Sequence, residues 1–312
     1  MVACLLNISP GWAQEKGYPN KSIEVVVPAS PGGSSDIATR IIAEELSRQL
    51  KVPFVVTNLA GAAGMSGAAK VLKAKPDGYT LLSSGTQGLI SSPIQSPNPP
   101  FDTFKDFTPI CSYGSSPMIF GIKNSSPFRT LEDLINYGRK NPDKLTCGIT
   151  NIGGEPHLLI ELFKKVVGIN IKPVPHKGTG DAVTALLGQH IDMMVLTYIG
   201  FLPYIKSGEA RVLAITQKVP GSGIPTFAEL GYPKVNIRTQ LGFYVSARTP
   251  GEIQEKLIPL FEKTAKDPNL VKKLESSGVV VEYKSPREFT SELREEWDIV
   301  SKLADEIGLK KK

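Results

Sequence analysis

The chain has 312 residues, of which 41% are hydrophobic and 21% are charged. This composition excludes an intrinsically disordered protein, because enough apolar surface is present to form a core. A chain of this length is expected to divide into two lobes. The net charge of +6 is spread along the chain, with no clusters that alternate basic and aromatic residues, so nucleic-acid binding is not expected. The sequence also lacks the run of about 18 to 20 apolar residues that spans a bilayer.

The N-terminus resembles the end of a secretory signal peptide. Residues 1–8 are apolar, and Gly11-Trp12-Ala13 places small residues where a signal peptidase cleaves. No Lys or Arg precedes the apolar run, so the leader has a truncated form. We expect residues 1–17 to be a leader remnant of an exported protein. An irregular cytoplasmic N-terminus is the alternative.

Apolar runs alternate with helical stretches along the chain. The expected strands are 23–27, 54–56, 79–82, 145–150, 171–174, 191–196 and 211–216, and the expected helices follow residues 34–36, 67, 130, 157 and 181. This order predicts an α/β protein whose lobes each contain a mainly parallel sheet flanked by helices.

Two capping sequences near the C-terminus, Thr249-Pro250-Gly251-Glu252 and Ser285-Pro286-Arg287-Glu288, predict helices that pack on the outside of the first lobe. We therefore expect a first lobe of residues 18–118 plus 219–312 and a second lobe of residues 119–218. Cys111 and Cys147 lie in apolar, strand-like runs, which favours buried free thiols over a disulfide.

Two glycine-rich turns follow successive strands, at residues 30–36 and 58–67. Ligands of open α/β sheets bind at the carboxyl ends of strands, where the N–H groups of helix N-termini point at an anion. Glycines permit close approach and serines add hydroxyl groups. The turns therefore indicate an anion site. The alternative is that these residues only form turns and caps.

Other site classes lack their motifs. Gly61, Gly64 and Gly67 do not form a G-x-G-x-x-G sequence, and no phosphate-binding lysine loop or G-x-S-x-G elbow is present. His157, His176 and His190 lack the spacing of a metal-binding helix. We expect no cofactor and no metal. A hydrolase that uses Ser34, Ser35 or His157 is the alternative from another class.

Many blocks of the sequence are similar to the tripartite tricarboxylate transporter substrate-binding proteins, the Bug or TctC family. The matching blocks are Tyr18-Pro19 with residues 23–28, Pro31-Gly32-Gly33-Ser34-Ser35-Asp36 with Arg40, Asn58 with residues 61–64, residues 76–82, 141–146, His157-Leu158, residues 174–180, Ile191-Asp192 and residues 225–231. These blocks occur in the order and spacing of the family, and together they span nearly the whole mature chain.

The resemblance implies a two-lobed periplasmic binding protein of the type II class, which closes on a small carboxylate and delivers it to membrane transporter subunits. A monomer is expected, and the ligand would be a di- or tricarboxylate, an acidic amino acid or an aromatic acid. A ligand-sensing subunit for a signalling partner is the alternative. By this resemblance the carboxylate is held by Ser30, Gly32, Gly33, Ser35, Ala62, Ala63 and Gly64, and the far end of the ligand by Thr86, Gly154, Thr179 and Asp181.

The chain departs from the family pattern near the expected crevice. Gly154 stands where a Ser is common, His176 replaces the usual Tyr, Asp181 stands where Pro is frequent, and Gln240 stands where a Trp often occurs. These differences concern the part of the site that would select the ligand.

Overall fold

The computed structural model describes residues 17–309, so all but the last residue of the expected leader remnant lies outside the described residues. The described strands follow the order β2-β1-β3-β9-β4-β7-β5-β6, and β8 and β10 also pair with β4. The strands are β1 (Ile23–Val27), β2 (Phe54–Asn58), β3 (Thr80–Gly85), β4 (Phe107–Lys123), β5 (Thr146–Ile149), β6 (Lys172–Pro175), β7 (Met193–Thr197), β8 (Ala210–Ile215), β9 (Arg238–Ser246) and β10 (Val280–Lys284).

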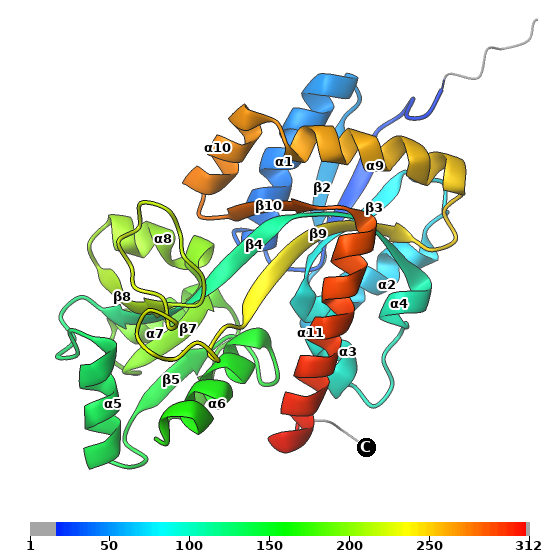
Figure 1. Cartoon of the computed structure of the whole chain (residues 1–312). Helices are drawn as coiled ribbons and strands as arrows, with labels where there is room; N and C mark the ends of the chain where they lie inside the picture. The colour runs from blue at the N-terminus through cyan, green and yellow to red at the C-terminus, as the bar shows by residue number, and fades with distance from the viewer. Residues whose placement is uncertain (1–16, 310–312) are drawn as a thin grey trace, which may run out of the picture.

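Strand β4 belongs to both halves of the molecule (Figure 1). Residues 107–117 pair with β9, and residues of β4 from 112 to 115 pair with β10. From Met118 onward β4 pairs with β7 and β8. We call β1, β2, β3, β9, β10 and β4 up to Pro117, with their helices, the first lobe. We call β5 to β8 and the rest of β4, with their helices, the second lobe. We propose that the chain enters the second lobe at residue 118, as expected from the sequence, and returns at β9 rather than at residue 219, because Phe227 and Val235 pack in the core of the second lobe.

Helices cover both faces of the sheet in each lobe (Figure 1). The helices are α1 (Ser34–Leu50), α2 (Met65–Lys73), α3 (Ser92–Gln95), α4 (Thr103–Asp106), α5 (Leu131–Lys140), α6 (Glu155–Val167), α7 (Thr179–Leu187), α8 (Tyr198–Lys206), α9 (Gly251–Ala265), α10 (Pro268–Ser276) and α11 (Pro286–Glu306), with a 3₁₀ turn η1 (Ala62–Gly64) and a π-helical turn η2 (Gln87–Ser91). The fold is therefore α/β, as predicted.

Strand β1 shows how the pattern of the sequence produces these layers. Side chains alternate between the two faces of a strand, so Ile23 and Val25 pack with α1 and α9, whereas Val26 packs with α2 and α11. All three side chains are fully buried. A strand covered on both faces must be apolar at nearly every position, which explains the continuous apolar run.

The strands that join the lobes are antiparallel, in contrast to the parallel pairs of β1 with β2 and β3 and of β5 with β6 and β7. The expected connection near residues 115–118 is therefore an uninterrupted strand. Strand β4 was not predicted from the sequence, because it contains Pro109, Gly114 and Pro117, and Pro and Gly normally mark turns. Register shifts between Pro109 and Cys111 and between Ser112 and Gly114 accommodate two of these residues.

Cys111 lies in β4 and Cys147 in β5, and both are buried free thiols, as predicted. Burial raises the pKa of Cys111 to about 12 and that of Cys147 further, so both are held as neutral thiols at neutral pH. No helix within residues 17–309 is long and apolar enough to cross a membrane.

Candidate functional site

A cavity of about 640 Å³ lies between the two lobes. The first lobe lines it with residues 28–35, Ala60, Gly61, Ala63, Gly64, Ser84, Gly85, Gln87, Gly88 and Thr239. The second lobe contributes Met118, Thr150, Asn151, Glu155, Pro156, residues 177–180, Leu196, Thr197, Gly200, Pro203 and Tyr204. The cavity thus collects the loops at the carboxyl ends of β1, β2, β5 and β6, where an α/β sheet binds its ligands.

Four helices begin at this cavity with a glycine at the N-cap position. These residues are Gly33 before α1, Gly64 before α2, Gly154 before α6 and Gly178 before α7, and none of them supplies a side-chain cap. The first N–H groups of a helix have no partner within the helix, and the helix dipole adds partial positive charge there. The helix N-termini can therefore supply hydrogen-bond donors to an anion in the cavity.

Asp36 fixes the first glycine-rich turn to the second. Its carboxylate accepts hydrogen bonds from the Gly32 N–H at 2.9 Å and from the Asn58 side-chain amide at 2.9 Å, and the Arg40 Nε lies 2.9 Å from Oδ1. Burial raises the pKa of Asp36, but the hydrogen bonds from Gly32, Arg40 and Asn58 outweigh burial and hold this pKa below its usual value. An ionised Asp36 therefore sets the shape of both turns without itself lining the cavity.

The second turn requires small residues. A Cβ on Gly67 would lie 2.7 Å from the Pro28 Cβ and 2.9 Å from the Leu59 carbonyl oxygen, so α2 can approach the first turn only through a glycine. Ala62 and Ala63 adopt positive φ angles of 45° and 51°, a conformation that costs free energy for any residue with a Cβ. Strained backbone of this kind concentrates at functional sites.

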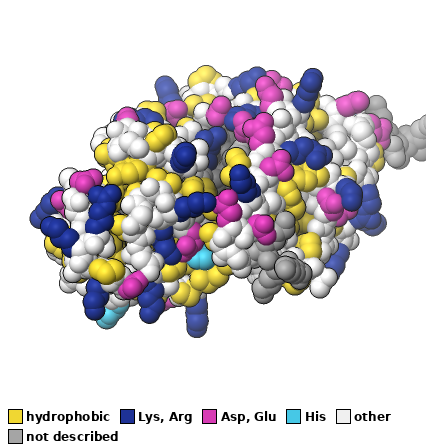
Figure 2. Space-filling model, turned by 60° about the horizontal axis from the view of Figure 1, so that its bottom comes forward, with side chains coloured by type: hydrophobic (Ala, Val, Ile, Leu, Met, Phe, Trp, Pro, Cys, Tyr) yellow, Lys and Arg dark blue, Asp and Glu magenta, His cyan; other side chains and the backbone are white. Residues whose placement is uncertain are grey.

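The second lobe supplies a different surface. Leu196, Pro203 and Tyr204 give it apolar character, and among the described residues that line the cavity the charged ones are Glu155 and Lys177. Lys and Arg side chains are interspersed with Asp and Glu over the face drawn in Figure 2. Selectivity is therefore expected from the few groups inside the cavity rather than from an extended charged surface.

Seven of the predicted ligand-binding residues line the cavity, and they are Ser30, Gly32, Gly33, Ser35, Ala63, Gly64 and Thr179. Four others lie outside its lining. Ala62 is exposed in η1, and Gly154 is buried at the N-cap of α6. Thr86 is fully buried and donates to Glu155 at 2.7 Å. Asp181 is exposed and accepts a hydrogen bond from the Lys177 N–H at 3.2 Å.

The remaining departures from the family pattern also make internal contacts. His176 Nδ1 lies 3.2 Å from Asp181 Oδ2, and the Gln240 side-chain amide donates to Glu296 at 2.7 Å. Neither His176 nor Gln240 lines the cavity. Both residues therefore contact neighbouring side chains outside the cavity lining and do not line the cavity themselves.

Glu155 is a site residue that was not predicted from the sequence. Glu155 opens α6 and lines the cavity, although its side chain is only 2% exposed. The sequence did indicate that Glu155 lies in the first turn of a helix, because it follows a glycine-rich loop and directly precedes Pro156. Sequence alone gives no reason to bury such a side chain.

The structure does not bring His157 into the cavity with Ser34 and Ser35. Ser34 and Ser35 line the cavity, whereas His157 lies outside its lining. His157 Nδ1 accepts a hydrogen bond from the Gly153 N–H at 3.1 Å, and its Nε2 lies 3.5 Å from Glu161. Over residues 17–309, no group of three or more His, Cys, Asp or Glu side chains is placed to hold a metal ion.

Comparisons with known proteins agree with this architecture. Residues 38–309 match the tripartite tricarboxylate transporter family receptor, TctC. Protein BugT of Bordetella pertussis is 34% identical over 221 residues, which cover 70% of this chain and 68% of BugT. A structure described as a periplasmic transporter has a TM-score of 0.87 and 32% identity, and the match covers 94% of this chain and 99% of that chain. An R. palustris protein, in a structure with adipate, has a TM-score of 0.86 and 28% identity over 93% of this chain and 98% of its own. The chain therefore belongs to the TctC family of tripartite tricarboxylate transporter receptors, which are solute-binding proteins of the periplasmic binding fold.

Proposed function

We propose that this protein is an exported binding protein that captures a small organic acid in the cavity and delivers it to the membrane subunits of a tripartite tricarboxylate transporter. The observation that carries this proposal is the opening of glycine-capped helices α1, α2 and α7 onto one cavity. Their N–H groups match the oxygens of a carboxylate, and their dipoles favour its charge. We propose that the protein acts as a monomer in the periplasm.

The ligand class follows from the two walls of the cavity. The turns of the first lobe would hold one carboxylate, and Leu196, Pro203 and Tyr204 would contact the carbon skeleton. The adipate in the structure of the R. palustris relative supports an aliphatic dicarboxylate. Tricarboxylates, acidic amino acids and aromatic acids share the same carboxylate group and belong in the same test. Binding is favoured over hydrolysis because His157 is held by Gly153 and lies outside the cavity lining.

A thermal-shift assay with adipate, malate, citrate, glutamate and benzoate tests the proposal. A ligand at about 100 times its dissociation constant stabilises the folded protein by about 2.7 kcal/mol, which raises the melting temperature by several degrees. We expect at least one of these acids to do so. If none of them shifts the transition, the proposed carboxylate specificity is wrong.

A pair of glycine variants locates the site. Gly33→Val should abolish the shift, because the side chain would crowd the N-terminus of α1. The fold should persist, since Gly33 has an ordinary φ of −74° and an added Cβ would meet only the Ser30 carbonyl oxygen at 3.4 Å. Gly251→Val is the matched control, because Gly251 begins α9 outside the cavity with open space around it. Equal ligand affinity in Gly33→Val and the wild type would exclude the first turn as the binding element.

A further inference from the structure

Glu155 joins the second lobe to the floor of the cavity. Its Oε1 accepts a hydrogen bond from the Thr86 hydroxyl at 2.7 Å, and its Oε2 accepts one from the Thr239 hydroxyl. Thr86 follows β3 and Thr239 lies in β9, so both donors belong to the first lobe. Glu155 therefore connects the start of α6 to two strand ends across the interface between the lobes.

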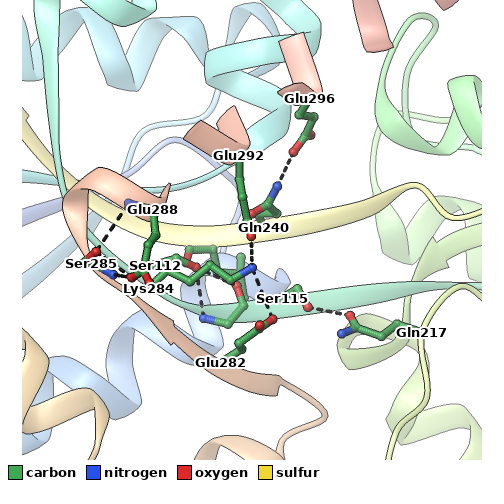
Figure 3. Close-up of polar contacts among 12 residues, drawn as sticks. Ser112, Ser115, Gln217, Gln240, Glu282, Lys284, Ser285, Glu288, Glu292 and Glu296 are labelled. Atoms are coloured by element: carbon green, nitrogen blue, oxygen red, sulfur yellow. Dashed lines mark hydrogen bonds and ion pairs between the residues drawn. The ribbon is translucent and has the colours of Figure 1, made fainter. Parts of the chain in front are cut away.

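A second carboxyl group lies close behind the first. Glu296 of α11 accepts a hydrogen bond from the Gln240 side chain at 2.7 Å, and Figure 3 shows Gln240 pointing toward it. The Gln240 backbone N–H donates to the Thr86 hydroxyl oxygen at 3.4 Å, and Thr86 in turn donates to Glu155. Thr86 and Gln240 thus lie between the two carboxyl groups in one hydrogen-bonded chain.

No basic side chain within residues 17–309 forms an ion pair with Glu155 or Glu296. The charged and titratable groups on the elements around the pair include His157 and Glu161 on α6, Lys177 before α7, Arg238 and Tyr244 on β9, and Glu292 and Arg294 on α11. Of these, His157 lies beside Glu161, and Glu292 forms an ion pair with Lys284. The positive charge of Arg238 lowers the pKa of Glu296, but this effect is smaller than those of burial and of the Glu155 charge, which raise it. Glu155 is buried and Glu296 is partly buried, so the pair is expected to lower its charge by holding a proton.

We propose that Glu155 and Glu296 form a proton-holding carboxyl pair, and that a carboxylate ligand enters the cavity together with a proton bound to this pair. This inference rests on the proposed binding of a carboxylate. Glu155 lines the cavity, so an anionic ligand would add negative charge beside it. Like charge disfavours the ionised form of a carboxyl group, so the bound ligand strengthens proton binding by the pair.

The linkage has a defined direction and pH range. Because proton and ligand each favour binding of the other, affinity for the anion is highest where the pair is protonated and falls as the pH rises. Burial raises the pKa of Glu155 to about 7, and burial together with the charge of Glu155 raises the pKa of Glu296 to about 8. The fall should therefore begin near pH 7. Uptake of one proton per ligand corresponds to about a tenfold loss of affinity per pH unit.

Calorimetric titration with adipate, and with any other acid of the panel that raises the melting temperature, tests the linkage. Titrations in two buffers of different ionisation enthalpy count the protons taken up per ligand. We expect proton uptake in the wild type at pH 7.5 and little or none in Glu155→Gln, which keeps the size and the hydrogen-bond acceptor of Glu155 but cannot ionise. Glu296→Gln should reduce the uptake, and Glu252→Gln, an exposed position in α9, should leave it unchanged.

The apo protein provides a second measurement. Since the folded pair binds protons more tightly than the unfolded chain, the melting temperature of the wild type should fall as the pH rises from 5.5 to 9, and Glu155→Gln should flatten this fall. Binding without proton uptake, or equal uptake in the wild type and Glu155→Gln, would overturn the inference and leave the proposed function standing. Failure of every acid to bind would overturn both.

Discussion

Replacement of Asp36 by Asn tests whether one buried carboxylate holds the two glycine-rich turns together. The side chain is 3% exposed and receives hydrogen bonds from Gly32, Arg40 and Asn58. Asn keeps the size but places an NH₂ group where an acceptor is needed. If the NH₂ group takes the place of Oδ2, the Gly32 N–H loses its acceptor; if it takes the place of Oδ1, the Asn58 amide and the Arg40 Nε lose theirs.

The expected loss can be estimated from these contacts. A buried donor left unsatisfied costs about 1–3 kcal/mol, and a hydrogen bond that loses a charged acceptor weakens by about 1 kcal/mol. The ion pair adds less than about 1 kcal/mol, because the Arg40 side chain is half exposed. Because these donors are only partly buried, Asp36→Asn should lower the free energy of unfolding by about 1–3 kcal/mol.

Urea unfolding followed by circular dichroism measures this change through the midpoint and the slope. Glu262→Gln is the control, since its ion pair with Lys266 is exposed and should contribute less than about 0.5 kcal/mol. Because the pKa of Asp36 is lowered in the folded state, its contribution is present near neutral pH and is lost as the pH falls below about 4. A variant within 0.5 kcal/mol of the wild type at pH 7 would refute the role assigned to Asp36.

Two further predictions concern packing and thiol chemistry. Gly67→Ala should destabilise the protein by about 1–3 kcal/mol, because its Cβ would overlap Pro28 and the Leu59 carbonyl; an unchanged urea midpoint would contradict the close approach of α2. Cys111 and Cys147 should resist a thiol reagent in the native protein and react together on unfolding, since both are buried neutral thiols; rapid labelling of either residue in the native protein, located by peptide mapping to distinguish it from Cys4, would contradict that burial.

Much of the fold was accessible from local pattern. The apolar run Ile23–Val27 predicted β1 with its observed bounds, and the capping residues before α5 and α11 predicted where those helices begin. Strands β4 and β9 were not predicted, because prolines and glycines lie along β4 and directly before β9, where they indicate turns. Their strand conformation depends on pairing partners far away in the sequence, which no local pattern records.

The candidate site also contains residues that local sequence predicted and residues whose role depends on long-range contacts. The turns at residues 30–36 and 58–67 were predicted to contribute ligand contacts, and most of their selected residues line the cavity. The role of Thr86 differed, because it faces Glu155 rather than the cavity. Thr86 lies 69 residues before Glu155 in the chain, so their contact could not be expected from spacing.

By itself the sequence determined most of the elements and, through many ordered motifs, the family, and it predicted an anion site at the glycine-rich turns. These properties depend on short-range features: alternation along a strand, glycine at a helix N-cap and a serine or aspartate in the first turn. Only the tertiary structure decided which groups face each other across the lobes. It buried Glu155 against Thr86 and Thr239, with Glu296 beyond Thr86 and Gln240, and burial there raises the pKa of both carboxyl groups.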